Sequence, residues 1–349
     1  PEEVLAAIPE QAQTIHRALG MQRYGMRFRR SADFPLEADV VVVDEASMVD
    51  LGLMRQLLDA TPPNATLLIV GDPDQLTSVE AGSVLRDLVR ASEQTWWSGR
   101  VTRLTKTYRY DAEQALGKLV GAIREGDASG VEGLLGEGSD DLHWAPLDTL
   151  PAELDRTTTY WSEVVHENAP ARHFALRSRF VMLSPYRVGP VGTRALGAAV
   201  VERLRAAGWG DLPVTPIMIE ENSQELGVFN GDFAMLIDGS PRTACVQRDS
   251  DELPNVAEAR LPRYSDAFAL TVHKSQGSEF DEVLVLFPQE DAPLLTRELL
   301  YTAVSRAKKR VRLVGPKEVV TAALRRKAER YSGLVDAIAE VEHVPLRKD

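Results

Sequence analysis

Carboxylate and amide side chains follow two apolar runs near the start of the chain, at positions where they could act on a phosphoryl group. Asp44 and Glu45 come directly after four valines, and Asp72 ends a second apolar run shortly before Gln75. A carboxylate such as Asp44 can hold Mg²⁺, usually through water, and a neighbouring Glu45 can activate the attacking water. The neutral amide of Gln75 can sense the γ-phosphate without adding charge, and Asp72 could couple the site to a neighbouring domain. We predict Glu45 and Gln75 as catalytic, Asp44 and Asp72 as cofactor-binding, and Asp44 as the Mg²⁺ ligand.

Two arginines could supply positive charge to the same reaction. Phosphoryl transfer spreads negative charge over the γ-oxygens, and a rigid guanidinium can meet it with two hydrogen bonds. Arg109 closes the run LTKTYR, and Arg306 closes the run YTAVSR. A lone arginine is usually a surface residue, so this prediction depends on the neighbouring motifs. Contributed by different domains, Arg109 and Arg306 would let an interdomain cleft close on ATP.

The most specific string in the chain is TVHKSQGSEF, which begins at Thr271. It reads as a strand that ends in a polar loop with a glycine at the turn. Threonine and histidine side chains can donate to DNA phosphates, and a glutamate can engage nucleotide hydroxyls; alone, His273 would more often be a satisfied core histidine. The predicted DNA-binding residues of this string are Thr271, His273 and Glu279, and its predicted cofactor-binding residues are Gln276 and Gly277.

A second possible DNA contact lies near the N-terminus, where Thr14 and His16 open a helical stretch. Thr14 could contact the backbone of single-stranded DNA together with His16, or it could simply cap the helix. Aromatic side chains for base stacking could come from Phe229, Trp96 or Trp97, although tryptophan pairs more often belong to a core or a partner interface.

The phosphate-binding loop of the form G-x-x-x-x-G-K-[ST] does not occur in these 349 residues. Gly117-Lys118 is the only Gly-Lys pair, and it lacks both the upstream glycine and the following serine or threonine. The sequence begins at Pro1 with an apolar pattern already under way. We therefore expect the natural start to lie upstream and this chain alone to be unable to hydrolyse ATP.

Composition limits the class of protein. No apolar run approaches the roughly 20 residues needed to span a bilayer, so no membrane partner is expected. The single cysteine, Cys245, fits a reducing compartment, and we expect a cytoplasmic protein. The net charge of −12 argues against a general nucleic-acid binder, but residues 297–330 hold eleven Lys or Arg against three Glu. This local basic stretch suits a channel for one strand; its residues 325–330 could equally be a solvated helix face.

The elements that would position these residues form an α/β pattern. Residues 38–44 and 66–72 are apolar runs typical of strands buried on both faces of a parallel sheet, with helical spacing over 51–60 between them. Glycines at 126–138 suggest a linker, and short β runs with turn signals suggest a small β-barrel-like insert. The predicted domains are 1–110, 111–210, an insert at 211–262, and 263–349, which resumes the α/β pattern and ends in a helix.

These motifs resemble those of superfamily 1 helicases, and specifically of the RecD family. The resemblance covers nearly the whole chain except the phosphate-binding loop and the adenine-contacting segment. The matching segments are residues 14–16 (motif Ib), 44–48 (motif II), 71–76 with 78–82 (motif III), 107–109 (motif IV), 229–232 (a signature of the insert), 271–280 (motif V) and 301–306 (motif VI).

The resemblance implies two RecA-like P-loop NTPase domains, the first incomplete here, with an SH3-like β insert in the second. It implies a 5′→3′ DNA helicase powered by ATP and Mg²⁺, which acts on single-stranded DNA and DNA ends. It also implies RecB and RecC as partner subunits in an exonuclease V complex that repairs double-strand breaks. Nuclease activity belongs to another subunit of that complex, so no nuclease site is predicted.

Three alternatives stay open at this point. The chain could be a helicase-derived scaffold without catalysis, although the retained acids, glutamine and arginines weigh against it. It could be a stand-alone RecD-like helicase, against which the wording SVEAG at residues 78–82 weighs moderately. It could act on RNA, which a contact to the 2′-hydroxyl would decide.

Overall fold

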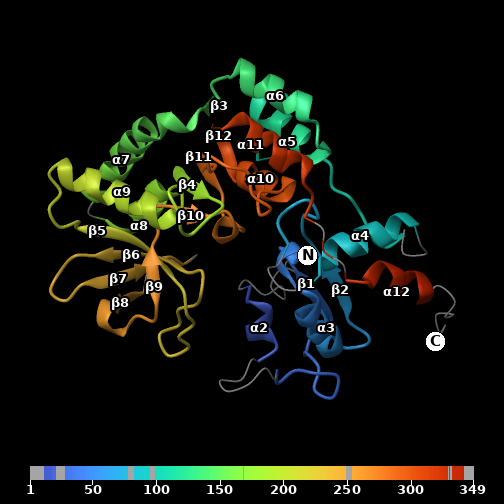
Figure 1. The fold of residues 1–349 in the computed structure, drawn as a ribbon. Coiled ribbons are helices and arrows are strands. Elements are labelled where there is room, and N and C mark those ends of the chain that lie inside the picture. The colour runs from blue at the N-terminus through green and yellow to red at the C-terminus, as the bar shows by residue number, and fades with distance from the viewer. Residues whose placement is uncertain are drawn as a thin grey trace. The chain divides into compact units, whose positions relative to one another are not determined.

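The computed structural model describes residues 12–20, 28–77, 82–94, 99–107, 109–167, 169–248, 254–328, 330 and 332–341. The chain divides into two compact units, residues 1–104 with 329–349 and residues 105–328 (Figure 1). No helix among the described residues is long and apolar enough to cross a membrane.

The first unit is built on a parallel pair of strands. Strand β1 (Val40–Val43) pairs with β2 (Thr66–Ile69), and α3 (Leu51–Ala60) connects them. Asp50 starts α3, because its carboxylate accepts a hydrogen bond from the amide of Leu53 at 2.8 Å. The predicted β-α-β unit is confirmed, and both strands therefore end at the same edge of the sheet.

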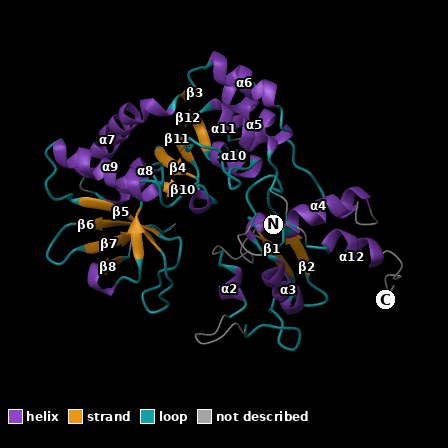
Figure 2. Ribbon diagram, viewed as in Figure 1, coloured by secondary structure: helices purple, strands orange, loops and turns teal. Residues whose placement is uncertain are grey.

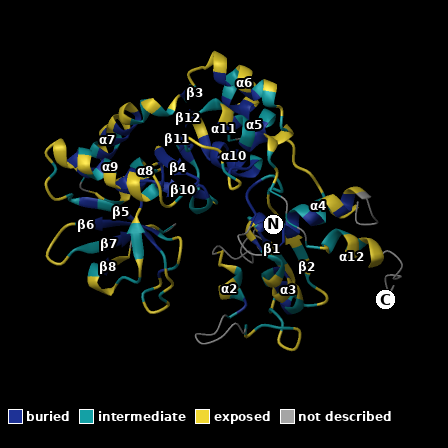
Figure 3. Cartoon of the chain, in the orientation of Figure 1, coloured by how far each residue is buried: buried dark blue, intermediate teal, exposed yellow. Residues whose placement is uncertain are grey.

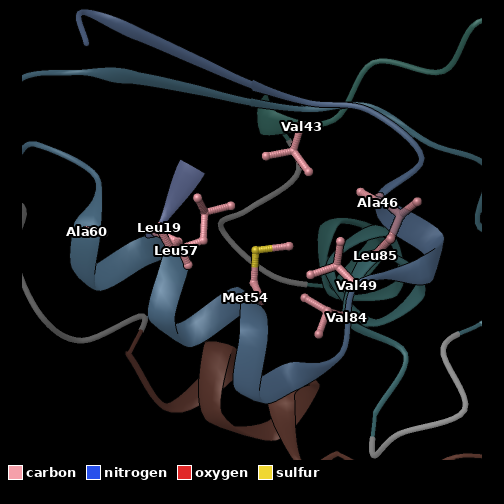
Figure 4. Packing of buried hydrophobic residues seen from close by; sticks show 9 residues of the cluster. All are labelled: Leu19, Val43, Ala46, Val49, Met54, Leu57, Ala60, Val84 and Leu85. Atoms are coloured by element: carbon pink, nitrogen blue, oxygen red, sulfur yellow. The ribbon is translucent and has the colours of Figure 1, made fainter. Parts of the chain in front are cut away.

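One face of this sheet packs on a hydrophobic core. The core lies between the strands, α3 and α4 (Val84–Gln94), with the short helix α2 (Ile15–Ala18) beside it (Figure 4). Its buried members are Leu19, Val43, Ala46, Val49, Met54, Leu57, Ala60, Val84 and Leu85.

The opposite face of the sheet is open, so the prediction of strands buried on both faces is wrong for the first unit. The alternating side chains of Val40, Val42, Leu68 and Val70 are exposed. A continuous valine run gives no alternation from which to tell a one-sided from a two-sided strand, and here the described elements cover only one side.

The C-terminal helix α12 (Leu334–Glu340) also belongs to the first unit. It packs along α4, and the hydroxyl of Ser332 donates to the carboxylate of Asp87. Its position after the second domain in the sequence predicts that this helix belongs to that domain. Leu334 instead packs against the core of the first unit, which the order of elements along the chain does not reveal.

The second unit contains a five-stranded parallel sheet. Every neighbouring pair runs parallel, and β4 is buried along its whole length, as a two-sided strand should be. The strand order is β10 (Leu270–Thr271), β4 (Phe180–Ser184), β11 (Phe280–Leu286), β12 (Ala307–Val314) and β3 (Leu142–Ala145).

Helices lie on both sides of this sheet (Figure 2). On one side are α5 (Ala115–Glu125), α6 (Ala128–Glu137), α10 (Arg297–Val304) and α11 (Lys317–Arg325), and on the other are α7 (Leu150–His166), α8 (Pro170–Arg177) and α9 (Thr193–Ala206).

The predicted linker over residues 126–138 is wrong, because helix α6 occupies most of this stretch and packs against α5, which ends just before it. Gly126 ends α5 with φ at +78°, and Asp127 starts α6 by accepting from the amide of Gly130 at 3.0 Å. Glycine here terminates a helix in the left-handed conformation rather than loosening the chain.

The predicted β insert is a five-stranded antiparallel sheet with its own buried core (Figure 3). Its last strand lies beyond the predicted boundary at residue 262. In the described part of the chain the sheet is open, with β8 and β9 at its edges, so the barrel-like closure stays a prediction. The order is β8 (Asn255–Ala257), β7 (Thr243–Val246), β6 (Phe233–Ile237), β5 (Val214–Ile219) and β9 (Tyr264–Asp266).

Two adjacent leucines of α3 test the packing of the first unit. Leu57 is 2% exposed in the core, whereas Leu58 is 49% exposed. We expect Leu57→Ala to lower the free energy of unfolding by about 2–5 kcal/mol, because it leaves a cavity. Leu58→Ala should change it by no more than about 0.5 kcal/mol. Chemical denaturation of both variants measures the difference, and equal losses would contradict the described packing.

Candidate nucleotide and nucleic-acid site

The loop after β1 holds Glu45 in a strained backbone conformation. Glu45 has φ at +50°, and among the described residues it is the one non-glycine residue with positive φ. Its amide donates to the carboxylate of Asp44 at 2.8 Å, which fixes this turn. Left-handed backbone at a non-glycine residue costs about 1–3 kcal/mol and tends to occur at functional sites. Asp44 is exposed beside it and therefore accessible to a ligand.

The loop after β2 lies directly against this turn. The amide of Ala46 donates to the carbonyl of Val70 at 3.0 Å. A Cβ atom at Gly71 would lie 2.9 Å from the Ala46 nitrogen and 2.8 Å from the Leu85 side chain, so only glycine fits there. The two acidic motifs are therefore in contact, as the shared strand edge predicts.

Gln75 lies in this second loop as a buried amide with an open acceptor. Its Nε2 donates to a carboxylate oxygen of Asp72 at 3.3 Å, while Oε1 is buried without a hydrogen-bond partner. The hydroxyl of Ser47, in the neighbouring loop, is likewise buried and unpartnered. A buried polar atom without a hydrogen bond costs free energy, so these two oxygens favour a further hydrogen-bonding partner such as a water.

The acidic side chains of the loops after β1 and β2 also fit a magnesium nucleotide. No group of three or more metal-ligating side chains occurs within the described ranges. Mg²⁺ commonly takes only one or two protein carboxylates, with waters and phosphate oxygens as its other ligands. The exposed Asp44 carboxylate is therefore a sufficient protein ligand of this kind.

Arg109 lies in the second unit, which corrects two predictions: that Arg109 belongs to the first domain and that the two arginines come from different domains. Its Nε donates to Glu279 at 2.8 Å, with Nη2 also bonded to that carboxylate, and its Nη1 donates to the carbonyl of Ser305 at 2.8 Å. Lys308 pairs with the same carboxylate at 3.0 Å. No spacing in the sequence predicts this role of Lys308.

Arg306 is 1% exposed, and its guanidinium bonds to its own surroundings. Nε donates to the carbonyl of Thr302 at 3.1 Å, and Nη1 donates to the carbonyl of Ser278 at 3.2 Å. The structure thus joins Arg306 to the loop of residues 271–280. In this arrangement the guanidinium does not face solvent, so a contact to phosphate stays a prediction that requires these bonds to exchange.

The loop of residues 271–280 brings its predicted residues together at the end of β10. The amide of Lys274 donates to the hydroxyl of Thr271 at 3.3 Å, and Gly277 turns the chain with φ at +74°. His273 and Gln276 are half-buried rather than part of the core. The interpretation of His273 as a core histidine is therefore not supported.

At the N-terminus, Thr14 caps α2, because its hydroxyl accepts from the amide of Arg17 at 3.3 Å. The capping interpretation is confirmed, and the exposed side chains of Thr14 and His16 leave the DNA contact as a prediction. Trp96, Trp97, Tyr108 and residues 78–81 lie outside the described residues.

Some arginines of the basic stretch, residues 297–330, bond to neighbouring loops and helices of the second unit. Arg326 donates to the carboxylate of Asp291 and to the carbonyls of Ala292 and Leu295. Arg297 donates to the carbonyl of Leu324 at 2.9 Å. These arginines hold loops together, so a continuous strand-binding face is not built from all of residues 297–330.

Two cationic side chains, Lys308 and Arg109, bond to the carboxylate of Glu279. Burial alone would raise the pKa of Glu279, but Lys308 and Arg109 bond to the carboxylate and together hold its pKa below the ordinary 4.5. A lowered folded-state pKa stabilises the fold above the ordinary pKa, and this stabilisation is lost as the pH falls through the folded-state value.

We therefore expect Glu279→Gln to flatten the loss of thermal stability as the pH is lowered below about 4.5. Melting temperatures between neutral pH and acid, read by circular dichroism, check this. Glu282→Gln is the control, since this glutamate also loses an ion pair, with Arg310 at 3.0 Å, but lies outside the bonds among Glu279, Lys308 and Arg109. Parallel pH curves for wild type and Glu279→Gln would contradict the assignment.

Comparison with known proteins places the chain in a class. Residues 2–142 match the AAA domain family, and residues 266–314 match the UvrD-like helicase C-terminal domain. These matches make the sequence similar to superfamily 1 helicases. The parallel sheets and the antiparallel sheet make the fold α/β.

Within this class the chain is RecD-like. It is 40% identical over 332 residues to the RecBCD enzyme subunit RecD of Mycobacterium tuberculosis, across 93% of this chain and 57% of that protein. It is 29% identical over 342 residues to the ATP-dependent RecD2 DNA helicase of Deinococcus radiodurans, across 94% of this chain and 43% of that one. The chain thus spans little more than half the length of the RecD proteins it matches.

Among solved structures, the chain is similar to Pif1 helicase from Bacteroides in complex with ADP-AlF3 and single-stranded DNA. The TM-score is 0.48 at 15% sequence identity, across 95% of this chain and 84% of that one. A structure of Pif1 helicases at forked double-stranded DNA gives a TM-score of 0.49 at the same identity, across 94% and 82%.

Proposed function

We propose that the full-length protein is an ATP-dependent 5′→3′ DNA helicase or translocase that acts as a RecD-like subunit beside RecB and RecC in double-strand break repair. The observation that carries the proposal is the left-handed Glu45, held in contact with the loop of the buried Gln75. Strain and an unsatisfied acceptor persist together where function requires them. The likeness to RecD along 93% of the chain supports the same conclusion.

In this proposal the residues of the first unit prepare the attack on the γ-phosphoryl group. ATP supplies that group, and a bound Mg²⁺ would supply positive charge for it. Asp44 would hold the metal, Glu45 would accept the proton of the attacking water, and Gln75 would orient that water through its Oε1. Asp72 holds the Gln75 amide in place through the hydrogen bond at 3.3 Å.

In the same proposal, the second unit supplies the cationic side chains and the residues that contact the DNA strand. Arg109 and Arg306 would exchange their present carboxylate and carbonyl partners for phosphate oxygens, with Gln276 and Gly277 beside them. Thr271 and His273 donate to DNA phosphates, and Glu279 reaches nucleotide hydroxyls. Thr14 and His16 add a contact from the first unit.

A stand-alone DNA helicase is the second candidate function. The identity to the Deinococcus RecD2 helicase is lower, at 29%, and covers 43% of that protein. The two candidates differ in partners and share the same site chemistry. Co-purification of the full-length protein with RecB and RecC from its own host would decide between them.

We expect ATP hydrolysis stimulated by single-stranded DNA in the full-length protein but not in this chain, which lacks a phosphate-binding loop. Glu45→Gln should lower turnover by about 10²–10⁴-fold while nucleotide still binds, because loss of a general base removes that factor. Phosphate release with and without oligothymidylate measures this. Unchanged turnover in Glu45→Gln would contradict the assignment of the base.

His273→Ala serves as a control in the same assay. It should raise the DNA concentration needed for half-maximal stimulation, because it removes a donor to the strand rather than a group that acts on water. A loss of turnover at saturating DNA would place His273 in the nucleotide site instead. Absence of stimulation in every full-length form, with partners present, would favour the scaffold interpretation.

A further inference from the structure

Three cationic side chains surround one carboxylate where the antiparallel sheet of the second unit meets its parallel sheet. Glu220, which follows β5, is 8% exposed. It pairs with Arg187 at 2.8 Å, with Lys274 at 3.0 Å and with Arg263 at 3.7 Å. We call these four residues the Glu220 cluster.

The members of the Glu220 cluster come from different loops. Arg187 lies after β4, Lys274 lies directly after His273 in the loop that follows β10, and Arg263 precedes β9. The amide of Glu220 also donates to the carbonyl of Arg263 at 2.7 Å. The carboxylate therefore holds the cations together beside the loop that is proposed to grip DNA.

The cluster keeps more positive charge than its carboxylate can neutralise. Burial would raise the pKa of Glu220, but hydrogen bonds from Lys274, Ser265 and Arg187 lower it to about 2, so the carboxylate stays ionised. One negative charge faces three positive ones, and Glu221 alongside is exposed and carries a second. An excess of positive charge thus remains on a chain whose net charge is −12.

The two arginines can reach a ligand without leaving the cluster. Both Arg187 and Arg263 are exposed, and a guanidinium carries five donors, more than one shared carboxylate can accept. Arginine also matches the geometry of phosphate oxygens with paired hydrogen bonds. The donors that Glu220 does not accept can therefore bind an anion while each arginine keeps its pair with the carboxylate.

We propose that the Glu220 cluster binds a backbone phosphate of single-stranded DNA, extending the path of the strand from Thr271 and His273 onto the antiparallel sheet. Arg187 and Arg263 contact the phosphate, and Glu220 acts as a positioning residue that fixes them beside Lys274. This inference rests on the proposed function, because it assumes that the loop of residues 271–280 contacts DNA.

The test measures the salt dependence of oligothymidylate binding by the full-length protein, using fluorescence anisotropy. Each phosphate contact to a single strand contributes about 0.7 to the slope of log affinity against log salt. We expect Arg187→Ala and Arg263→Ala each to reduce the slope by about 0.7 and to weaken binding. Arg187→Lys should retain most of the slope, since it keeps the charge.

Arg260→Ala is the matched control. Arg260 is an exposed arginine near the same sheet, and it pairs with Glu225 at 2.9 Å outside the cluster. Its removal changes the net charge equally and should leave the slope unchanged. Equal slopes for the Arg187, Arg263 and wild-type proteins, or an equal loss in Arg260→Ala, would overturn the proposal.

Two further outcomes separate this inference from the proposed function. If the cluster variants lose affinity for ATP in the absence of DNA and keep their DNA slope, the cluster holds a nucleotide phosphate and the inference is wrong. If the wild-type protein does not bind oligothymidylate, the proposed function fails and the inference fails with it. Melting curves equal to wild type confirm that the variants are folded.

Discussion

The hydrogen bonds of the buried Arg306 guanidinium are the interaction on which the second unit depends. Burying a charge costs several kcal/mol unless hydrogen bonds replace its water. Here the carbonyls of Thr302 and Ser278 replace it, and these carbonyls belong to the end of α10 and to the loop that precedes β11. Because Arg109 bonds to Ser305 and Glu279 across the same segments, two arginines fix the loops after β10 and α10 against each other.

This constraint gives the proposed motor a physical means of coupling. The arginines proposed to meet phosphate are the same ones that hold the loop of residues 271–280, which is proposed to contact DNA. The buried Arg306 can meet a phosphate only if it exchanges its bonds to the carbonyls of Thr302 and Ser278. An exchange of partners during phosphoryl transfer would therefore free or reposition residues 271–280. In the first unit the close approach of Gly71 to Ala46 gives a comparable link between the turn of Glu45 and the loop of Gln75.

The parts that were predictable from the sequence are those that local patterns encode. The strand runs ending in Asp44 and Asp72 are continuous apolar runs, and α3 has helical spacing and a cap at Asp50, so local sequence specifies them without tertiary information. The open face of the β1–β2 sheet, the packing of α12 on α4 and the partners of Arg109 depend on contacts between distant residues. The same is true of Lys308 and Glu220, whose surroundings no spacing in the sequence discloses.

The most direct test of the central claim is directional movement of the full-length protein along single-stranded DNA. In stopped-flow experiments with ATP, a fluorophore at the 3′ end should report arrival after a lag that grows in proportion to oligonucleotide length. A fluorophore at the 5′ end should show no such lag. A lag that depends on length only at the 5′ end would contradict the polarity, and the absence of any such lag would contradict the account of an ATP-driven DNA motor.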